Sequence, residues 1–375
     1  MISRRKFLYT SSLLTLGFSI NINANVLNKE EKTFDFYMPE ESQKHKQTWM
    51  SFVSNDYIWA KKQIPEVKRN LALIAKTIAK YEPVSILVSK YDKNEAIELL
   101  GDLDSHNYSI TLVEKDIDDL WLRDTGSTFV YNKKNEKFGV DFNFNGWGED
   151  QEHELDSTIA KSACKKSNVK RIETDLILEG GCFEVDGEGL AIMSESCILN
   201  DNRNPNKSKK EVEKELKYLL GLEKIIWLKG IKGKDITDGH TDFYARFISS
   251  NEIIVAYEPY EDSYEHKLTK ENISILENAR DLNGNKFKIT LLENPQEINE
   301  KYGTKSFAAG YIGYYLCNKA VIMQSFGDVY ADKKAKNTLE KAYPNRVIEQ
   351  IRIDGIASGG GSIHCATQQE PIDLG

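Results

Sequence analysis

A cysteine near the end of the chain has the surroundings of a nucleophile. Residues 359–361 are three consecutive glycines, which allow backbone conformations closed to other residues and a close approach to a ligand. Cys365 follows them, within a segment that we expect to form a short strand. A cysteine after a glycine turn is more often a small buried apolar group. Its assignment as a nucleophile therefore depends on polar residues elsewhere in the chain that can activate a thiol.

Three other polar clusters are candidates for those partners. They are WLRDTG at residues 121–126, EGG at 179–181 and DGHTD at 238–242. The last cluster alternates like a strand, so its two aspartates and its histidine are expected to share one face. Such spacing also suits a metal ion, but no cysteine or second histidine lies nearby to complete a site. We therefore predict no metal and no other cofactor.

The composition argues against several classes of function. The 375 residues carry a formal net charge of −8 without long runs of one sign, so nothing points to nucleic-acid binding. An acidic surface is compatible with a cationic substrate. The five cysteines are an odd number, and their spacing fits neither a zinc site nor a disulfide framework. Apart from Cys365, they are expected to be small buried apolar groups: Cys164, Cys182, Cys197 and Cys317.

The N-terminus has the pattern of an export signal. SRRKFL at residues 3–8 precedes an apolar stretch at 13–22, which resembles a twin-arginine signal covering residues 1–24. The apolar stretch is too short and too polar to cross a membrane, so no stable membrane anchor is expected. We predict a linker at residues 25–37, recognition by the twin-arginine export machinery, and a periplasmic or secreted protein.

The rest of the chain, residues 38–375, is predicted to be one domain built from a repeat. The order strand–strand–helix–strand recurs at intervals of very roughly 60 residues. Its clearest helix spans residues 208–220, with a capping box formed by Ser208 and Glu211 and with Gly221 just past its end. If residues 359–369 join the first strands, five units close a ring through the two chain ends. Four units are expected in full, each with two strands, a helix and a third strand. Their ranges are 125–131, 138–144, 153–166 and 169–173 in one unit; 182–185, 190–193, 208–220 and 225–228 in the next; 243–249, 253–257, 269–282 and 287–292 in the third; and 308–316, 320–324, 331–342 and 347–353 in the fourth.

The four polar clusters occupy equivalent places in this repeat. Asp124, Glu179, His240 and Cys365 each follow the last strand of one unit. In a ring of such units these positions point towards one axial opening, so residues far apart in the sequence are expected to meet there.

The motifs together resemble a known family. MPEE at 38–41, HKQTW at 45–49, the three clusters above, and GGGSIHCATQQ at 359–369 are similar to the motifs of the agmatine deiminases. These belong to a wider guanidine-modifying group with the peptidylarginine and arginine deiminases. The resemblance covers the chain from about residue 36 to its end. Two residues depart from the family pattern: Ser127 stands where proline is usual, and Glu149, which we expect near the pocket for the far end of the substrate, stands where glycine is usual.

This resemblance implies a fold and a reaction. The fold belongs to the α/β class. It is a five-bladed, pseudo-symmetric α/β propeller built from strand–strand–helix–strand units. The reaction converts agmatine and water to N-carbamoylputrescine and ammonia through a covalent amidino-thioester. Carboxylates suit a planar guanidinium because they accept paired, charge-assisted hydrogen bonds. The implied catalytic residues are Cys365 as nucleophile, His240 as acid and base, Glu179 to orient the histidine, and Asp124 and Asp242 to hold the guanidinium.

Further residues are expected to contact the substrate. Besides the acids, we expect Asp238, Gly360 and Gly361 there, and the indoles of Trp121 and Trp147 are candidate walls for an aliphatic chain. His364 is expected to act in packing or behind the site, because neighbouring strand residues point to opposite faces. An ion pair between Arg123 and Asp124 is a structural alternative for that carboxylate. Four further histidines are expected to be surface or structural residues: His45, His106, His153 and His266.

Several alternatives remain open. Free arginine and peptidylarginine differ from agmatine at the far end of the substrate. An acidic residue of the protein there would favour a substrate amine, whereas an arginine residue would favour a substrate carboxylate. Arg203 and Arg246 are candidates for binding such a carboxylate. The chain stops ten residues after Cys365, which favours a small substrate. A periplasmic binding protein for guanidino compounds, an amidinotransferase and a cysteine protease are alternative functions, and a homo-oligomer is left open.

Overall fold

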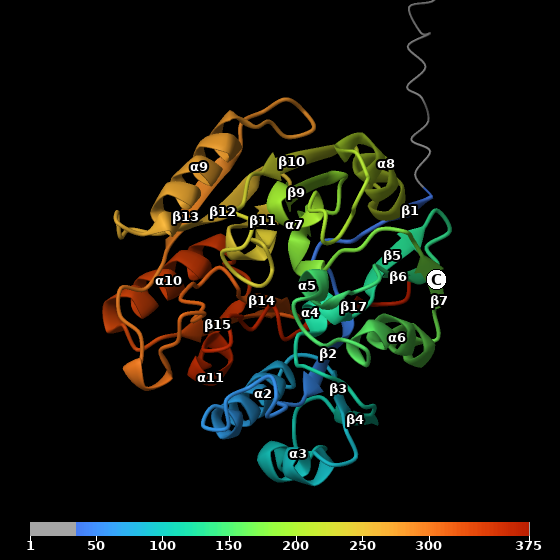
Figure 1. The fold of residues 1–375 in the computed structure, drawn as a ribbon, viewed down its shortest axis with the longest axis vertical. Helices are drawn as coiled ribbons and strands as arrows, with labels where there is room; N and C mark the ends of the chain where they lie inside the picture. The colour runs from blue at the N-terminus through green and yellow to red at the C-terminus, as the bar shows by residue number, and fades with distance from the viewer. Residues whose placement is uncertain (1–34, 375) are drawn as a thin grey trace, which may run out of the picture. The chain divides into compact units, whose positions relative to one another are not determined.

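The computed structural model describes residues 35–374 (Figure 1). The predicted export signal at residues 1–24 and most of the predicted linker lie outside these residues. The linker prediction is wrong at its end, because Phe36–Tyr37 form strand β1, which pairs with β5 in antiparallel fashion. In the described part of the chain, no helix is long and apolar enough to cross a membrane.

The strands form five separate sheets, each with the same order of pairing. A first strand pairs antiparallel with a second, and a helical crossover leads to a third strand that pairs parallel with the second. Three sheets have three strands each: β8 (Phe183–Val185), β9 (Leu190–Ser194) and β10 (Lys224–Leu228); β11 (Ala245–Ser249), β12 (Glu252–Tyr257) and β13 (Lys288–Glu293); and β14 (Tyr315–Cys317), β15 (Ala320–Ser325) and β16 (Val347–Arg352). The predicted repeat is confirmed at this level.

The other two sheets have four strands each. One joins β1 to β5 (Thr128–Asn132), β6 (Lys137–Asp141) and β7 (Lys170–Glu173). The other has the order β17-β2-β3-β4, from β2 (His45–Phe52), β3 (Val84–Val88), β4 (Ile110–Glu114) and β17 (Gln368–Pro371). Because β17 pairs antiparallel with β2, the C-terminal segment completes the sheet that begins near the N-terminus of the described chain.

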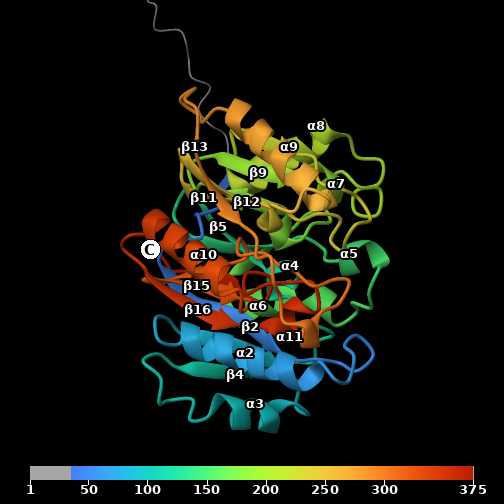
Figure 2. The same ribbon diagram turned by 90° about the vertical axis from the view of Figure 1, so that its left-hand side faces the viewer.

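Helices connect the strands within each sheet. The longer helices lie towards the outside in Figure 1, whereas α4, β14 and β17 lie towards the middle. Helices α2 and α3 lie next to each other beside the strands β3 and β4 in both Figure 1 and Figure 2. The longer helices are α2 (Ile64–Ile78), α3 (Lys93–Leu100), α6 (Ile159–Ser167), α8 (Lys209–Leu220), α9 (Tyr264–Asn278) and α10 (Val329–Ala342). The short ones are α4 (Leu122–Thr125), α5 (Gly146–Glu149), α7 (Glu195–Ile198), α11 (Asp354–Ala357) and the 3₁₀ turns Asp156–Thr158, Gly180–Cys182, Thr241–Phe243 and Glu300–Tyr302.

Helix α8 shows how local sequence determines an element. The Ser208 side chain accepts a hydrogen bond from the backbone N–H of Glu211, whose carboxylate accepts one from the backbone N–H of Ser208. Gly221 ends the helix with φ +71°, a conformation that favours glycine. The buried side of the helix carries apolar residues, so the predicted start, face and end of this helix are confirmed.

Two predicted strands are shorter than expected or absent. The strand expected at 308–316 is confined to β14, because the residues before it form turns and irregular backbone. The strand expected around Cys365 is a turn, in which the N–H of Ala366 donates to the carbonyl of Ser362, and the N–H of Thr367 to that of His364. Strand pairing begins only at Gln368, so the cysteine is presented by a loop.

Candidate active site

Seven of the predicted site residues line one cavity. The cavity has a volume of about 270 Å³ and is bounded by segments that follow strands of different sheets. The predicted residues that line it are Trp121, Asp124, Trp147, His240, Gly360, Gly361 and Cys365. The predicted convergence of distant segments is therefore present in the structure. Glu179, Asp238 and Asp242 lie outside the lining.

Cys365 lies at the floor of this cavity and is only 5% exposed. Its Sγ lies 3.2 Å from the Ser362 hydroxyl and 3.9 Å from Oδ2 of Asp242. Burial raises the pKa of the thiol well above its ordinary value, and the negative charges of Asp242 and Asp124 raise it further. These surroundings favour the neutral thiol, and a positive charge next to the sulfur would favour the thiolate.

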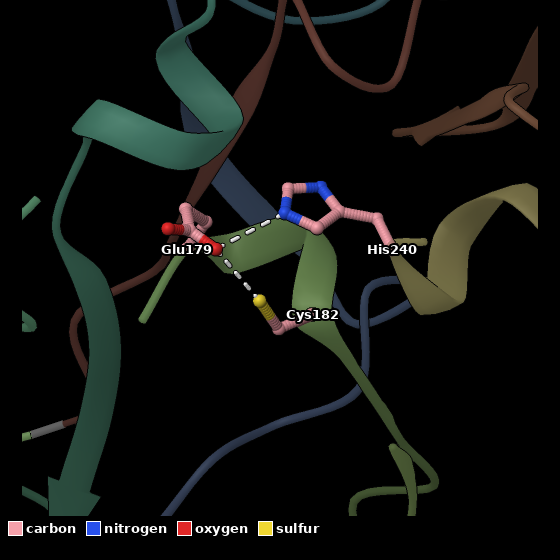
Figure 3. A group of neighbouring side chains, drawn as sticks. All are labelled: Glu179, Cys182 and His240. Carbon is pink, nitrogen blue, oxygen red and sulfur yellow. Dashed lines mark hydrogen bonds and ion pairs between the residues drawn. The ribbon is translucent and has the colours of Figure 1, made fainter. Parts of the chain in front are cut away.

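His240 faces the cavity from the turn before β11. Its Nε2 donates to Oε2 of Glu179 at 3.1 Å (Figure 3). Its Nδ1 lies 3.8 Å from Oδ1 of Asp124. Burial by itself would lower the pKa of the imidazole, but the Cys182 sulfur, Asp124 and Glu179 together raise this pKa well above its ordinary value. The ring is therefore an imidazolium that can donate a proton.

Glu179 lies behind His240 and is fully buried. Its Oε1 accepts from Nε of Arg203 at 3.0 Å, and its Oε2 accepts from both His240 and the Cys182 thiol (Figure 3). Burial would raise the pKa of this carboxyl, but the hydrogen bond from His240 and the charge of Arg203 lower it to about 2. Glu179 is thus a fixed anion that sets the orientation of the imidazole.

Asp124 presents its carboxylate at the cavity wall. Oδ2 accepts from the indole Nε1 of Trp147 at 3.0 Å, and Oδ1 accepts from the backbone N–H of Gly181 at 3.2 Å. Burial raises the pKa of this carboxyl to about 6, with further contributions from Asp242 and Glu179 that the positive His240 opposes. Near neutral pH the Asp124 carboxyl is ionised although its surroundings disfavour the charged form, and a bound cation would stabilise that charged form.

Asp242 has one oxygen held and one oxygen free. Oδ2 lies 2.6 Å from Nδ1 of His364, whereas Oδ1 is buried and has no hydrogen-bond partner among the described residues. Burial would raise the pKa of Asp242, but the hydrogen bond and charge of His364 lower it. A buried carboxylate oxygen without a donor is costly, so a donor from a ligand would be stabilising at Oδ1.

His364 connects this carboxylate to a residue that the sequence analysis missed. Its other ring nitrogen, Nε2, lies 2.8 Å from Oε2 of Glu41, which also accepts from Arg123 at 3.0 Å. His364 therefore lies behind the site, as expected, although from a turn and not from a strand. The MPEE motif that contains Glu41 was the available signal for it, but its 323-residue separation from His364 hid the contact.

The expected common face of Asp238, His240 and Asp242 is wrong. Asp238 has φ +60°, and residues Thr241–Phe243 form a 3₁₀ turn, so the segment does not alternate like a strand. The Asp238 carboxylate instead accepts from Nη1 of Arg203 at 2.7 Å and from the side chains of Asn200 and Asn202 at 2.9 and 3.0 Å. It is directed away from the cavity and holds the residues behind Glu179.

The arginines considered as carboxylate partners are already paired. Arg203 bonds Glu179 and Asp238, and Arg246 bonds Glu41 at 2.9 Å and also pairs with Glu184. Both are buried, and neither lines the cavity.

The structural alternative for Asp124 is not formed, because Arg123 bonds Glu41 and Gln369 and not Asp124. The expectation for Glu149 is wrong. Glu149, expected near the pocket for the far end of the substrate, does not line the cavity and has a side chain that is 73% exposed.

The cavity walls are aromatic and pack against glycine backbone. A Cβ added to Gly361 would stand 2.1 Å from the Trp121 ring, and one added to Gly359 would stand 2.0 Å from the Trp59 ring. These glycines are required because the indoles lie directly on the main chain. Trp59 was missed by the sequence analysis, as was Asp119, which accepts from its indole Nε1 at 2.8 Å. Other lining residues without a sequence signal are Ile58, Gln63, Gln151, Ile236, Thr237, Phe243, Thr304, Ser306 and Ser358.

Comparison with known proteins identifies the family of this chain. The Porphyromonas-type peptidyl-arginine deiminase family matches residues 37–371. A Legionella pneumophila (strain Paris) protein with a provisional agmatine deiminase name is 37% identical over 350 residues, which is 92% of this chain and 98% of that protein. The agmatine deiminase of Medicago truncatula is 32% identical over 369 residues, 90% and 96% of the two chains. The solved agmatine deiminase of Enterococcus faecalis superposes with a TM-score of 0.84 at 28% identity and covers 91% of this chain and 97% of that one.

Fold, site and relatives together define a guanidine-modifying enzyme, a hydrolase that acts on C–N bonds of amidines. The chain has a mixed α/β fold similar to that of the solved agmatine deiminases. Within this class it belongs to the Porphyromonas-type peptidyl-arginine deiminase family, to which the match extends over nearly all of the described residues.

Proposed function

We propose that the protein is an agmatine deiminase, which hydrolyses agmatine to N-carbamoylputrescine and ammonia. The observation that carries this proposal is a cavity lined by a thiol, an imidazolium and the Asp124 carboxylate, with a second carboxylate, that of Asp242, next to the thiol. Asp124 has a carboxylate at the wall. Asp242 has one oxygen, Oδ2, 3.9 Å from the Cys365 sulfur, and its other oxygen, Oδ1, has no donor among the described residues. Both carboxylates would accept N–H donors of a guanidinium.

Binding of the cation prepares the nucleophile. A guanidinium between the two aspartates would lower the raised pKa of Cys365 and that of Asp124, because its positive charge offsets the surrounding acids. The thiol loses its proton to solvent, and the thiolate attacks the central guanidinium carbon, so that a C–S bond forms as the C=N π bond breaks. The tetrahedral adduct loses one nitrogen as ammonia, which takes the proton of the His240 imidazolium. A covalent amidino-thioester remains.

Hydrolysis of the thioester restores the enzyme. The now neutral His240 takes a proton from water, the hydroxide attacks the same carbon, and the C–S bond breaks. The remaining hydroxyl proton of the adduct passes to solvent, the ureido product leaves, and the thiolate and imidazolium are restored. The thiolate takes up a proton from solvent once the cation has gone. Glu179 supports both steps because its two bonds, to His240 and Arg203, keep the imidazole in one orientation.

The cavity favours a substrate with an amine at its far end. Among the described residues that line it there is no lysine or arginine, whereas Asp119 and Asp124 are acidic. A substrate carboxylate would therefore find no lysine or arginine as a partner, since the cationic group of the lining is the His240 imidazolium that the reaction already uses. This favours agmatine over free arginine, with peptidylarginine as the runner-up substrate.

The test is an assay of ammonia and ureido product with agmatine, arginine and a short arginine peptide. We expect agmatine to give the highest kcat/KM, and Cys365→Ala to lose turnover while its circular dichroism is unchanged. Turnover near the wild-type rate in that variant would remove the nucleophile assignment. Binding of agmatine without ammonia release would instead indicate a binding protein. Turnover that depends on an added amine would indicate an amidinotransferase, and cleavage of the peptide would indicate a cysteine protease.

We also propose that the five sheets are the blades of a pseudo-symmetric propeller around the cavity. Support comes from their common strand order and from the β17–β2 pairing, which joins the two ends of the described chain. A crystal structure with the sheets stacked in layers would contradict this arrangement.

Export through the twin-arginine pathway, to the periplasm or beyond, is the corresponding proposal for residues 1–24. It rests on the RRKFL pattern at residues 4–8. Fractionation of cells that express the full chain and an Arg4→Lys, Arg5→Lys variant tests it. We expect the variant to accumulate in the cytoplasm, and equal distribution of the two proteins would reject it.

A further inference from the structure

Three metal-binding side chains meet behind the cavity. The Cys182 thiol donates to Oε2 of Glu179 at 3.0 Å, and Nε2 of His240 donates to the same oxygen at 3.1 Å (Figure 3). Their donor atoms all lie within 4.8 Å of one another, and all three residues are buried. The proposed reaction uses His240 and Glu179 but assigns nothing to Cys182.

The donors match one class of cation. Sulfur, imidazole nitrogen and a carboxylate oxygen are zinc ligands, whereas Mg²⁺ and Ca²⁺ prefer oxygen alone. Zinc bonds of about 2.0–2.3 Å in a tetrahedron place neighbouring donors roughly 3.3–3.7 Å apart. The two observed separations of 3.0 and 3.1 Å are only slightly shorter, so a small outward movement of Cys182 and His240 would admit the ion.

The surroundings leave the required oxygen available. Arg203 bonds Oε1 of Glu179 and not Oε2, so it can hold the carboxylate in place while Oε2 binds a metal. His240 also lines the cavity, which provides the route by which an ion would reach the group. Three protein ligands leave a fourth position for water.

We propose that Glu179, Cys182 and His240 form an inhibitory Zn²⁺ site. Binding of Zn²⁺ forms Zn–S, Zn–N and Zn–O bonds and releases two protons to solvent, one from the thiol and one from Nε2. The metal then occupies the nitrogen that Glu179 orients, and it prevents His240 from forming the imidazolium that protonates the departing nitrogen. This effect on turnover rests on the proposed function, but the binding site itself does not.

Cobalt provides a test that does not depend on turnover. The purified full-length protein is titrated with Co²⁺, and the absorption of the sulfur-to-cobalt charge transfer is recorded, followed by displacement with Zn²⁺. We expect one ion per chain and a charge-transfer band in the wild type, in Cys365→Ser and in the matched control Cys164→Ser, which alters another buried thiol. Cys182→Ser and Cys182→Ala should lose the band and bind Zn²⁺ at least ~100-fold more weakly.

Activity measurements complete the test. Zn²⁺ but not Mg²⁺ should inhibit ammonia release from agmatine by the wild type, EDTA should reverse the inhibition, and Cys164→Ser should behave in the same way. Loss of the band in Cys365→Ser with retention in both Cys182 variants would overturn the proposal, because the catalytic thiol would then be the ligand. Absence of stoichiometric binding in the wild type would also overturn it. A band without any hydrolysis of agmatine would uphold the metal site and reject the proposed reaction.

Discussion

Replacement of Asp124 by asparagine should stabilise the folded protein while it removes activity. The folded state raises the pKa of this carboxyl from an ordinary 3.8 to about 6, mainly because the group is buried, and also because Asp242 and Glu179 are close. An acid with a raised pKa destabilises the fold whenever it is ionised. The destabilisation is absent below pH 3.8, grows between pH 3.8 and about 6, and is complete above pH 6.

The structure also indicates the size of the effect. A pKa raised from 3.8 to about 6 corresponds to about 3 kcal/mol at neutral pH, at 1.36 kcal/mol per pKa unit. Asparagine has one acceptor oxygen in place of two, so either Trp147 or Gly181 loses its acceptor, which costs about 1 kcal/mol. We therefore expect Asp124→Asn to raise the free energy of unfolding by about 2 kcal/mol at pH 8.

Urea unfolding followed by circular dichroism from pH 4 to pH 8 measures this difference. The matched variant is Glu179→Gln, because burial there is outweighed by His240 and Arg203, and the pKa falls from 4.5 to about 2. That lowered pKa stabilises the fold above pH 4.5, and the stabilisation is lost as the pH falls through about 2. Glu179→Gln should therefore lose stability at pH 8. A gain for Asp124→Asn that does not grow with pH, or a loss of equal size in both variants, would refute the electrostatic reasoning.

Three further expectations concern catalysis. Gly181→Ala would place a methyl group 2.4 Å from Nδ1 of His240, so kcat should fall on the order of 100-fold with little change in circular dichroism, and a fall below threefold would contradict the tight contact. His364→Gln removes the charge that lowers the pKa of Asp242, so the acid limb of the pH profile of kcat/KM should move to higher pH, and an unmoved limb would argue against this role. Alkylation of Cys365 by iodoacetamide without substrate should accelerate steadily from pH 7 to pH 9, because its pKa is well above its ordinary value, and a plateau below pH 8 would contradict the neutral thiol.

Much of the fold could be predicted from the chain because its signals are local. The capping box and terminal glycine of α8 act within one helical turn, and the alternation of strands and helices follows from apolar spacing. Helix α9 shows the limit of this approach. It was predicted at 269–282 but begins at Tyr264, where the Ser263 side chain accepts from the N–H of Glu265. Its buried side includes polar residues, so the apolar pattern did not reveal its first turn.

The residue types of the site were also readable from the sequence, but their directions were not. Cys365, His240 and Asp124 meet at one cavity because segments after different strands converge there. Asp238 has the same spacing from His240 as Asp242 has, yet its φ of +60° turns it to Arg203. Side-chain direction follows the backbone dihedral angles at each residue, and these depend on contacts with distant parts of the chain.

The sequence by itself therefore determined the chemical groups, the order of the repeats and the two ends of helix α8, since each depends on neighbours within a few residues. Only the tertiary structure decided which atoms touch. The bonds from Glu41 to His364 and from His364 to Asp242 join residues more than 100 positions apart, and they place one oxygen of Asp242 beside the thiol and leave the other without a donor. Hydrogen bonds of about 3 Å require distance and direction together, and only the folded chain supplies both.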